Sequence, residues 1–199
     1  MPQRVKSRLM NATLNDGAAA APGLPPGTTR VIAESEVQAA LDRMAVAITA
    51  DLAGARPIAV TVMNGGLVFA GQLLTRLPFT LECDYIHVRR YGRLTVGGEL
   101  EWIAGPHVDV RGRTVLLLDD ILDEGRTLAV VKEALLARGA ADIRIAAFAR
   151  KDRGDPPAIE ADYVGVTVPD LFVFGFGMDV DGEFRNLPAV YALPAGDAG

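Results

Sequence analysis

The residues best suited to chemistry lie where an apolar stretch of the sequence ends. Val115-Leu-Leu-Leu118 leads directly into Asp119 and Asp120, and Asp123-Glu-Gly-Arg-Thr127 follows just before a helical pattern. Two adjacent carboxylates can bind a hard cation such as Mg²⁺ or accept hydrogen bonds from a pair of sugar hydroxyls. A glycine lets the backbone approach a ligand, and the free amides at the start of a helix favour a phosphate. The pattern therefore predicts a site for a phosphorylated sugar with Mg²⁺, with Asp123 available as a proton acceptor.

A plainer interpretation of this stretch is an acidic turn that only caps a helix. That interpretation would suffice for any two of the acids, but the complete ordered pattern favours a ligand site. Other phosphate motifs are missing from the sequence. It contains no G-x-x-x-x-G-K-[ST], and Gly175-Phe-Gly177 is followed neither by a third glycine nor by a helical pattern. The acidic stretch is thus the main candidate.

The elements that must position these acids alternate between strand and helix patterns. Apolar residues from Val37 to Leu52 recur at helical spacing, with Ser35 as the candidate N-cap, which predicts an amphipathic helix ending near Gly54. The stretch 57–63 is apolar and β-branched and ends in Asn64-Gly65-Gly66, which predicts a buried strand. The remaining predicted strands are 81–89, 114–118, 143–148, 163–168 and 171–176, and the remaining predicted helices are 67–77 and 127–138.

This order predicts an α/β fold with a mainly parallel sheet. The strand at 114–118 has no polar face, which is typical of a strand buried on both sides of a parallel sheet. Ligands of such folds bind beyond the carboxyl ends of the strands, and the polar or glycine-rich clusters of this sequence fall at such ends. The polar segment 90–105, with Gly97-Gly98 near its middle, is predicted to be a mobile hairpin arm.

Composition narrows the class of protein. The 199 residues carry a net charge of −5, which argues against a general nucleic-acid binder. One cysteine and two histidines exclude a disulfide framework and a Cys/His zinc site, so a reducing, cytoplasmic setting is expected. No apolar run approaches the roughly 18 residues that would indicate a membrane span. Residues 1–33 are expected to be a disordered extension and residues 34–199 a single domain.

The acidic stretch resembles the hallmark loop of the type I phosphoribosyltransferases, which binds phosphoribosyl pyrophosphate (PRPP) with four apolar residues, two acids and a D-x-G-x-T turn. The resemblance implies a mainly parallel sheet flanked by helices, with a small hood and a mobile lid hairpin. It implies that Asp119 and Asp120 hold the ribose hydroxyls, and that the 5′-phosphate is wrapped by Asp123, Glu124, Gly125, Arg126 and Thr127. Glu124 stands where many members carry Thr. Because a carboxylate cannot donate a hydrogen bond to phosphate, its side chain is expected to turn away.

The C-terminal region is similar to that of the hypoxanthine-guanine phosphoribosyltransferases. Val164-Gly-Val-Thr-Val-Pro-Asp-Leu-Phe-Val173 and the acidic turn that follows match the family pattern, and the resemblance covers about residues 34–193. It implies that Lys151 donates to the 6-oxo oxygen of a purine, since an ammonium cannot accept a hydrogen bond from a 6-amino group. Phe172 would stack on the base and the backbone of Val173 would read its edge. Asp179 would lie near Mg²⁺ together with Asp119 and Asp120, and Arg185 would meet the pyrophosphate.

Weaker matches concern the glycine loop and the lid. Asn64-Gly65-Gly66 matches the pyrophosphate loop of the family, where Lys commonly precedes the two glycines. Arg90-Tyr91 matches the start of the lid, where Ser-Tyr is common, and the extra arginine could meet pyrophosphate or stay in water. His87 and His107 fall on no functional position of the family, and Cys83 is expected to be a small buried residue.

The resemblance implies transfer of a 5-phosphoribosyl group from PRPP to N9 of hypoxanthine or guanine, which yields IMP or GMP and releases pyrophosphate. Asp123 would accept the proton from purine N7, and lid closure would exclude water. One alternative is a xanthine-preferring enzyme of the same class. Another is a regulator that senses PRPP or nucleotide and binds RNA, although the acidic charge and the presence of Asp123 argue against it. A homodimer or homotetramer is expected.

Overall fold

The structure is a computed structural model that describes residues 23–90 and 100–194. The expected extension as far as residue 22 and the middle of the expected hairpin arm, with Tyr91, lie outside the described residues. In chain order the elements are β1 (Thr29–Ile32), α1 (Glu34–Leu52), β2 (Ile58–Met63), α2 (Gly66–Leu74), β3 (Glu82–Arg90), β4 (Leu100–Ala104), β5 (Thr114–Leu122), α3 (Arg126–Ala137), β6 (Asp142–Asp152), β7 (Tyr163–Pro169), β8 (Val173–Phe174) and β9 (Val190–Ala192).

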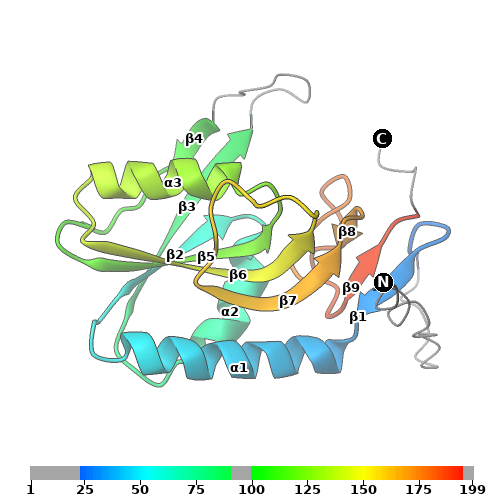
Figure 1. The fold of residues 1–199 in the computed structure, drawn as a ribbon, viewed down its shortest axis with the longest axis horizontal. Helices are drawn as coiled ribbons and strands as arrows, with labels where there is room; N and C mark the ends of the chain where they lie inside the picture. The colour runs from blue at the N-terminus through cyan, green and yellow to red at the C-terminus, as the bar shows by residue number, and fades with distance from the viewer. Residues whose placement is uncertain (1–22, 91–99, 195–199) are drawn as a thin grey trace, which may run out of the picture.

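The main sheet is mostly parallel. In the described part of the chain it has six strands in the order β4-β3-β2-β5-β6-β7, and β4 alone runs antiparallel to its neighbour (Figure 1). The predicted α/β class is therefore confirmed. From β2 the chain continues outward to β3 and β4, whereas β5, β6 and β7 extend the other side, so the strand order reverses between β2 and β5. Open α/β sheets bind ligands at such a switch point.

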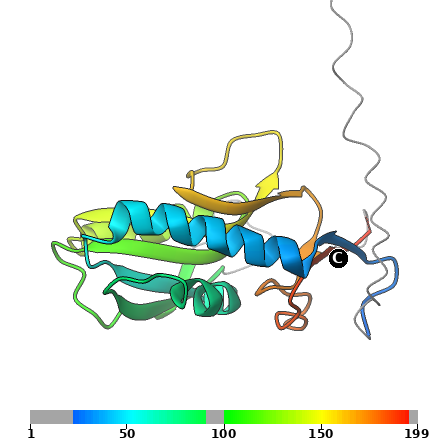
Figure 2. The ribbon, with the colours of Figure 1, turned by 90° about the horizontal axis from the view of Figure 1, so that it is seen from below.

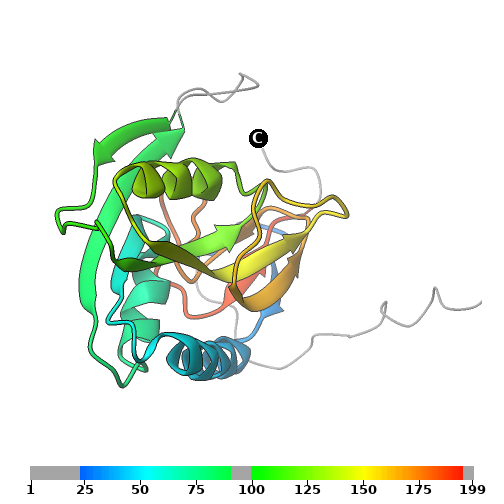
Figure 3. The same ribbon diagram turned by 60° about the vertical axis from the view of Figure 1, so that its left-hand side comes forward.

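Helices cover both faces of this sheet. The helices α1 and α2 lie on one face, which Figure 2 shows from below, and α3 lies on the other face (Figure 3). This layering explains why β5 begins with apolar residues alone. Leu116 and Leu118 belong to the core under α1 and α2, whereas Val115 and Leu117 belong to the core under α3. All four side chains are fully buried, and burying a side chain of this size contributes about 1.5–3 kcal/mol.

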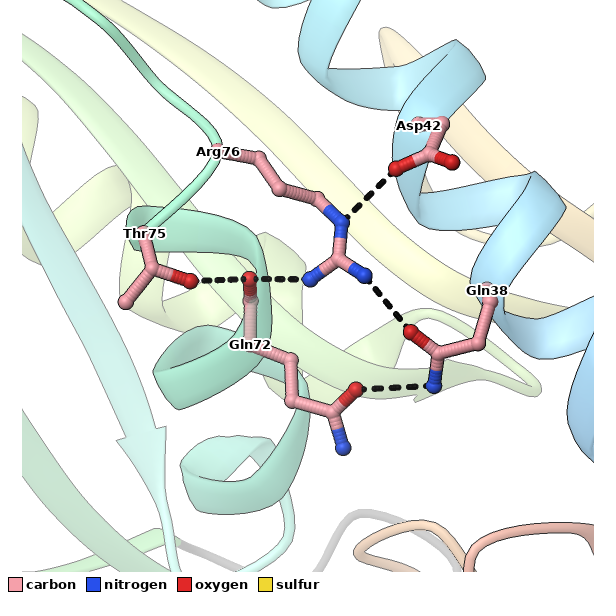
Figure 4. A network of polar contacts seen from close by, with 5 residues as sticks. All are labelled: Gln38, Asp42, Gln72, Thr75 and Arg76. Atoms are coloured by element: carbon pink, nitrogen blue, oxygen red, sulfur yellow. Dashed lines mark hydrogen bonds and ion pairs between the residues drawn. The ribbon is translucent and has the colours of Figure 1, made fainter.

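A polar network fixes α1 against the end of α2 (Figure 4). Arg76 donates hydrogen bonds to the carboxylate of Asp42 at 2.8 Å and to the side-chain oxygen of Gln38 at 2.6 Å. It also donates to the carbonyl of Gln72 at 2.8 Å, which accepts a further bond from the Thr75 hydroxyl. The planar guanidinium supports such a fork of directed bonds. The network thus anchors the end of α2, the helix that begins at the glycine loop.

A second sheet lies at one end of the main sheet. In the described residues it has the order β1-β9-β8, with antiparallel pairing throughout (Figure 1). We call this sheet, with the connecting residues 175–189, the hood. The expected boundary at residue 34 is wrong for Thr29–Ile32, because this segment is strand β1. A four-residue strand that pairs with the opposite end of the chain leaves no periodic pattern of its own.

Two strands are longer than predicted. β5 continues to Leu122 and β6 to Asp152, because their parallel pairing persists as far as Leu122 and Arg150. Asp119 and Asp120 therefore lie within a strand and not in the loop after it. The predicted strand 171–176 is reduced to β8, because the next two residues have positive φ, a conformation outside the range of strands.

Other corrections are local. Ala33, not Ser35, is the N-cap of α1, and its amide donates to the Glu36 carboxylate at 2.8 Å. Cys83 is exposed and not buried, because it lies on the same face of β3 as the exposed Tyr85, while Ile86 points into the core. The other predicted helices and strands are confirmed with shifted ends. Among the described residues, no helix is long and apolar enough to cross a membrane.

Candidate functional site

A cavity of about 600 Å³ opens at the switch point, where the carboxyl ends of β2, β3 and β5 meet the hood. We call it the large cavity. Its rim combines acids and cations with the glycine loop, so it can meet both hydroxyl groups and anionic groups. Among the residues that line it are Asn64, Gly65, His87, Arg89, Asp119, Asp120, Thr127, Asp179 and Arg185.

Asp119 and Asp120 lie near the end of strand β5, and both line the large cavity. Asp119 is 8% exposed, and one of its carboxylate oxygens accepts the Asp120 amide at 3.1 Å. Burial raises the pKa of Asp120, while the side-chain hydrogen bond with Asp119, the Ile121 amide and the charge of Arg185 oppose this rise. Both carboxylates are therefore largely shielded from water, and a ligand that offers hydroxyl groups or a cation would compensate their charge.

The glycine loop lies directly against these acids. A Cβ atom on Gly65 would overlap the carboxylate of Asp120, and one on Gly66 would lie 2.9 Å from the carbonyl of Leu118. Gly66 opens α2, so its amide is among those that α2 leaves free. The Met63–Asn64 peptide bond is cis. Two glycines are therefore required here by close approach, and they place free amides beside two carboxylates.

The start of α3 forms another wall. Gly125 is its N-cap in the left-handed conformation, with φ 75°, and Thr127 lines the large cavity. The side chain of Glu124 pairs with Arg126 at 3.3 Å. The Glu124 carbonyl accepts the Ala158 amide at 2.8 Å. Glu124 is thus engaged by Arg126 and by the loop after β6, which leaves Thr127 as the side chain of this turn that faces the large cavity.

A smaller cavity of about 190 Å³ adjoins the large one. The two share Asp120, Ile121 and Asp179 in their linings, so a single ligand pair could occupy both. Phe172 is 40% exposed at this small cavity, and Val173 is buried beside it on β8. An accessible aromatic ring next to a backbone edge suits a flat heterocycle. The full lining is Asp120, Ile121, Asp123, Lys151, Phe172, Val173, Met178 and Asp179.

Asp123 is paired with two cations. Its Oδ2 lies 3.0 Å from Lys151 Nζ, and its Oδ1 accepts a hydrogen bond from Arg153 Nη1 at 2.8 Å. Asp123 raises the pKa of Arg153, first through this hydrogen bond and then through its charge. Sequence reasoning missed Arg153. Lys151 lies in β6 and Arg153 directly follows this strand, and both side chains reach Asp123. A second cation two residues after Lys151 was the available signal.

Asp179 and Arg185 are joined across a tight turn of the hood. Arg185 Nη2 lies 2.6 Å from Asp179 Oδ1, and the Gly182 amide donates to Asp179 Oδ2 at 2.7 Å. Arg185 Nη1 also donates to the Gly177 carbonyl at 2.6 Å. The positive φ values of Asp181 and Gly182 close the turn and bring the two ends together. The hood therefore presents one acid and one cation to the large cavity.

Strand β3 contributes two side chains that sequence reasoning gave no role. His87, which the resemblance left without function, lines the large cavity with Arg89, because β3 pairs in register with β2 up to Met63 and His87. Arg90 is the last residue of β3, and its side chain is not among those that the structure describes. Among the described residues, no three His, Cys, Asp or Glu side chains are grouped closely enough to hold a metal ion on their own.

Known proteins share this architecture. Residues 29–181 match the family model of the phosphoribosyl transferase domain. The hypoxanthine-guanine phosphoribosyltransferase of Bacillus subtilis is 35% identical over 164 residues, which cover 82% of this chain and 91% of that protein. A solved hypoxanthine phosphoribosyltransferase from Staphylococcus aureus superposes with a TM-score of 0.78 at 30% identity, covering 83% of this chain and 90% of that one.

A longer relative is also similar. The bifunctional protein TilS/HprT of Listeria innocua is 38% identical over 164 residues, or 82% of this chain. The aligned region covers 25% of that protein, so this chain spans about a quarter of the length of the bifunctional relatives it matches.

Proposed function

We propose that this chain, which belongs to the family of hypoxanthine-guanine phosphoribosyltransferases, converts PRPP and a 6-oxopurine into a nucleoside 5′-monophosphate and pyrophosphate. The observation that carries the proposal is the pair of adjoining cavities. The large one joins carboxylates, free amides and cations, and the small one joins an accessible aromatic ring to a lysine. A phosphorylated sugar in the first would place its anomeric carbon next to a flat base in the second.

In the large cavity, the carboxylates of Asp119 and Asp120 would accept hydrogen bonds from the ribose 2′- and 3′-hydroxyls. Thr127 and the first amides of α3 would bind the 5′-phosphate, because helix N-termini favour anions. At the opposite wall, the amides of Gly65 and Gly66 would meet the pyrophosphate together with Arg185. In this arrangement the scissile bond would lie between the acids of β5 and the hood.

The acids of the large cavity have the oxygen donors that Mg²⁺ prefers. Asp119, Asp120 and Asp179 come from two different parts of the chain and line one cavity. Protein sites usually hold Mg²⁺ with one or two carboxylates, and waters and substrate phosphates complete its shell. These residues fit that mode, and one or two of their carboxylates would hold the ion. The ion would supply positive charge to the departing pyrophosphate.

In the small cavity, Phe172 would stack on the purine and Lys151 would donate to its 6-oxo oxygen. As the bond from the anomeric carbon to pyrophosphate breaks, purine N9 forms the new bond to that carbon, and the proton on N7 passes to Asp123. Proton transfer to a positioned carboxylate contributes typically about 10²–10⁴-fold to the rate. Asp123 lines the small cavity together with Lys151, which suits this role.

The test is a substrate panel. The full chain is incubated with PRPP and Mg²⁺ and, in turn, with hypoxanthine, guanine, xanthine, adenine and uracil, and nucleotide formation is followed. We expect IMP and GMP from hypoxanthine and guanine. Turnover of xanthine alone would replace the proposal by its xanthine-preferring alternative, and no turnover of any oxopurine would overturn it.

We further propose that the chain works as a homodimer or homotetramer in the cytoplasm. The exposed Tyr85, Trp102 and Ile103 on β3 and β4 support an association of copies, since large exposed apolar groups often mark interfaces. Light scattering behind size exclusion measures the state directly, and a monomer would refute it. The lid role of Arg90 and Tyr91 stays a prediction.

A further inference from the structure

Charged side chains follow three neighbouring strands at the same edge of the main sheet. Asp123 follows β5, Arg153 follows β6 and Asp170 follows β7. The register pairs Leu122 with Arg150, so the ends of β5 and β6 lie close together. Arg153 Nη1 lies 2.8 Å from Asp123 Oδ1 and 3.5 Å from Asp170 Oδ1. Arg153 therefore bridges two acids across the ends of three strands.

The two oxygens of Asp123 have different partners. Oδ1 is bonded to Arg153 and Oδ2 faces Lys151. Lys151 is 15% exposed and lines the small cavity, so its ammonium can turn from Asp123 to a bound base. Arg153 is not among the described residues that line either cavity, and its side chain is 35% exposed. Lys151 can therefore reach a ligand in the small cavity, whereas Arg153 contacts Asp123 and Asp170 from outside it.

We propose that Arg153 is a positioning residue, which holds Asp123 by Oδ1 while Oδ2 passes from Lys151 to the purine. The inference rests on the proposed function. When the base enters, Lys151 leaves Oδ2 to donate to the 6-oxo oxygen, and Oδ2 becomes free to take the N7 proton. Without a second anchor the carboxylate would rotate or follow the lysine. Arg153, itself held by Asp170, keeps the carboxylate aimed at N7.

Arginine suits this position because its guanidinium is planar and stays charged at every relevant pH, so it cannot take the proton that Asp123 must receive. Positioning of this kind has large kinetic effects, since a misplacement of about 1 Å can cost about 10²-fold in rate. The expected loss therefore falls on the chemical step, while the contacts that hold PRPP are left in place.

The experiment compares Arg153→Ala and Arg153→Lys with Arg150→Ala as the matched control. Arg150 lies near the end of β6, three residues before Arg153, and its guanidinium lies 3.8 Å from the carboxylate of Glu160. With PRPP and hypoxanthine, we expect Arg153→Ala to lower kcat about 10- to 100-fold with KM for PRPP within about twofold. Arg153→Lys should restore part of the loss, because it keeps the charge but not the fork. Arg150→Ala should match the unmodified chain.

A double-mutant cycle separates positioning from general support of the structure. In the Asp123→Asn background, Arg153→Ala should cause no further loss, because the group it positions is gone. An equal loss in both backgrounds, or a kcat for Arg153→Ala equal to that of the unmodified chain, would overturn the inference. Should Arg153→Ala fail to fold, Arg153→Lys carries the same cycle. Failure of the unmodified chain to convert hypoxanthine would instead refute the proposed function itself.

Discussion

Replacing Lys151 by alanine should weaken the choice between 6-oxo and 6-amino purines. In the structure, Lys151 Nζ lies 3.0 Å from Asp123 at the small cavity, with 15% of its side chain exposed. A hydrogen bond to a charged group contributes about 1.5–3 kcal/mol, which corresponds to about 10- to 140-fold in a rate ratio. Adenine offers no acceptor at its 6-position in this orientation and forfeits that bond.

The lower part of this range is expected. Lys151 gives up a partly exposed ion pair with Asp123 when it turns to the base, and such pairs contribute up to about 1 kcal/mol. We therefore expect Lys151→Ala to lower the ratio of kcat/KM for hypoxanthine to that for adenine by about 10- to 30-fold.

The assay measures initial rates of nucleotide formation with each base at saturating PRPP. Lys132→Ala on α3 is the control, because Lys132 lines neither cavity in the described structure and should leave the ratio unchanged. A ratio that stays at the value of the unmodified chain in Lys151→Ala would show that another group reads the 6-position, and the base-recognition argument would fail.

Three further substitutions test other parts of the argument. Asp123→Asn should lower kcat by roughly 10²–10⁴-fold in steady-state assays with KM for PRPP little changed, and near-normal turnover would remove Asp123 from the proton-acceptor role. For Asp84, burial raises the pKa, but the amides of Val108, Tyr85 and His107 outweigh it, so the pKa is lowered overall. A carboxylate whose pKa is lowered by folding stabilises the fold when the pH is above the ordinary pKa of aspartate. This stabilisation is lost as the pH falls through the pKa of the folded state. Asp84→Asn should therefore reduce the free energy of unfolding by about 1–3 kcal/mol at pH 7, and urea titrations should show this difference narrowing below about pH 4; a constant difference contradicts the assignment. Gly177→Ala should reduce kcat/KM and thermal stability more than Gly154→Ala, since both glycines have positive φ but only Gly177 lies against backbone; equal effects would show that strain alone matters.

The acidic stretch was predictable because its chemistry is local. Four apolar residues, two acids and a glycine turn occur in one continuous segment, and the structure brings Asp119, Asp120 and Thr127 to one cavity. The parallel sheet was predictable for the same reason, since a strand without a polar face must be covered on both sides. The strand ends were not, because the length of β5 is set by its pairing with β6 and not by its own residues.

Residues that act through tertiary pairing gave weaker signals. Arg153 acquires its place from the alignment of β5, β6 and β7, which no single segment encodes. His87 and Arg89 reach the large cavity because β3 lies beside β2 and extends past its end. A family motif could not indicate them, since neither residue stands at a position that the motif specifies.

The hood shows how the two halves of the site are held together. A Cβ atom on Gly177 would overlap the carbonyl of Gly65, and one on Gly65 would overlap the carboxylate of Asp120. The backbone of the hood, the glycine loop and the carboxylate of Asp120 on β5 therefore meet with no room for a further side chain between them. Arg185 joins this contact to the turn that begins at Asp179, because its guanidinium donates to the Gly177 carbonyl and pairs with the Asp179 carboxylate. Because both cavities share Asp120 of β5 and Asp179 of the hood, a shift of the hood relative to β5 would change the two cavities together.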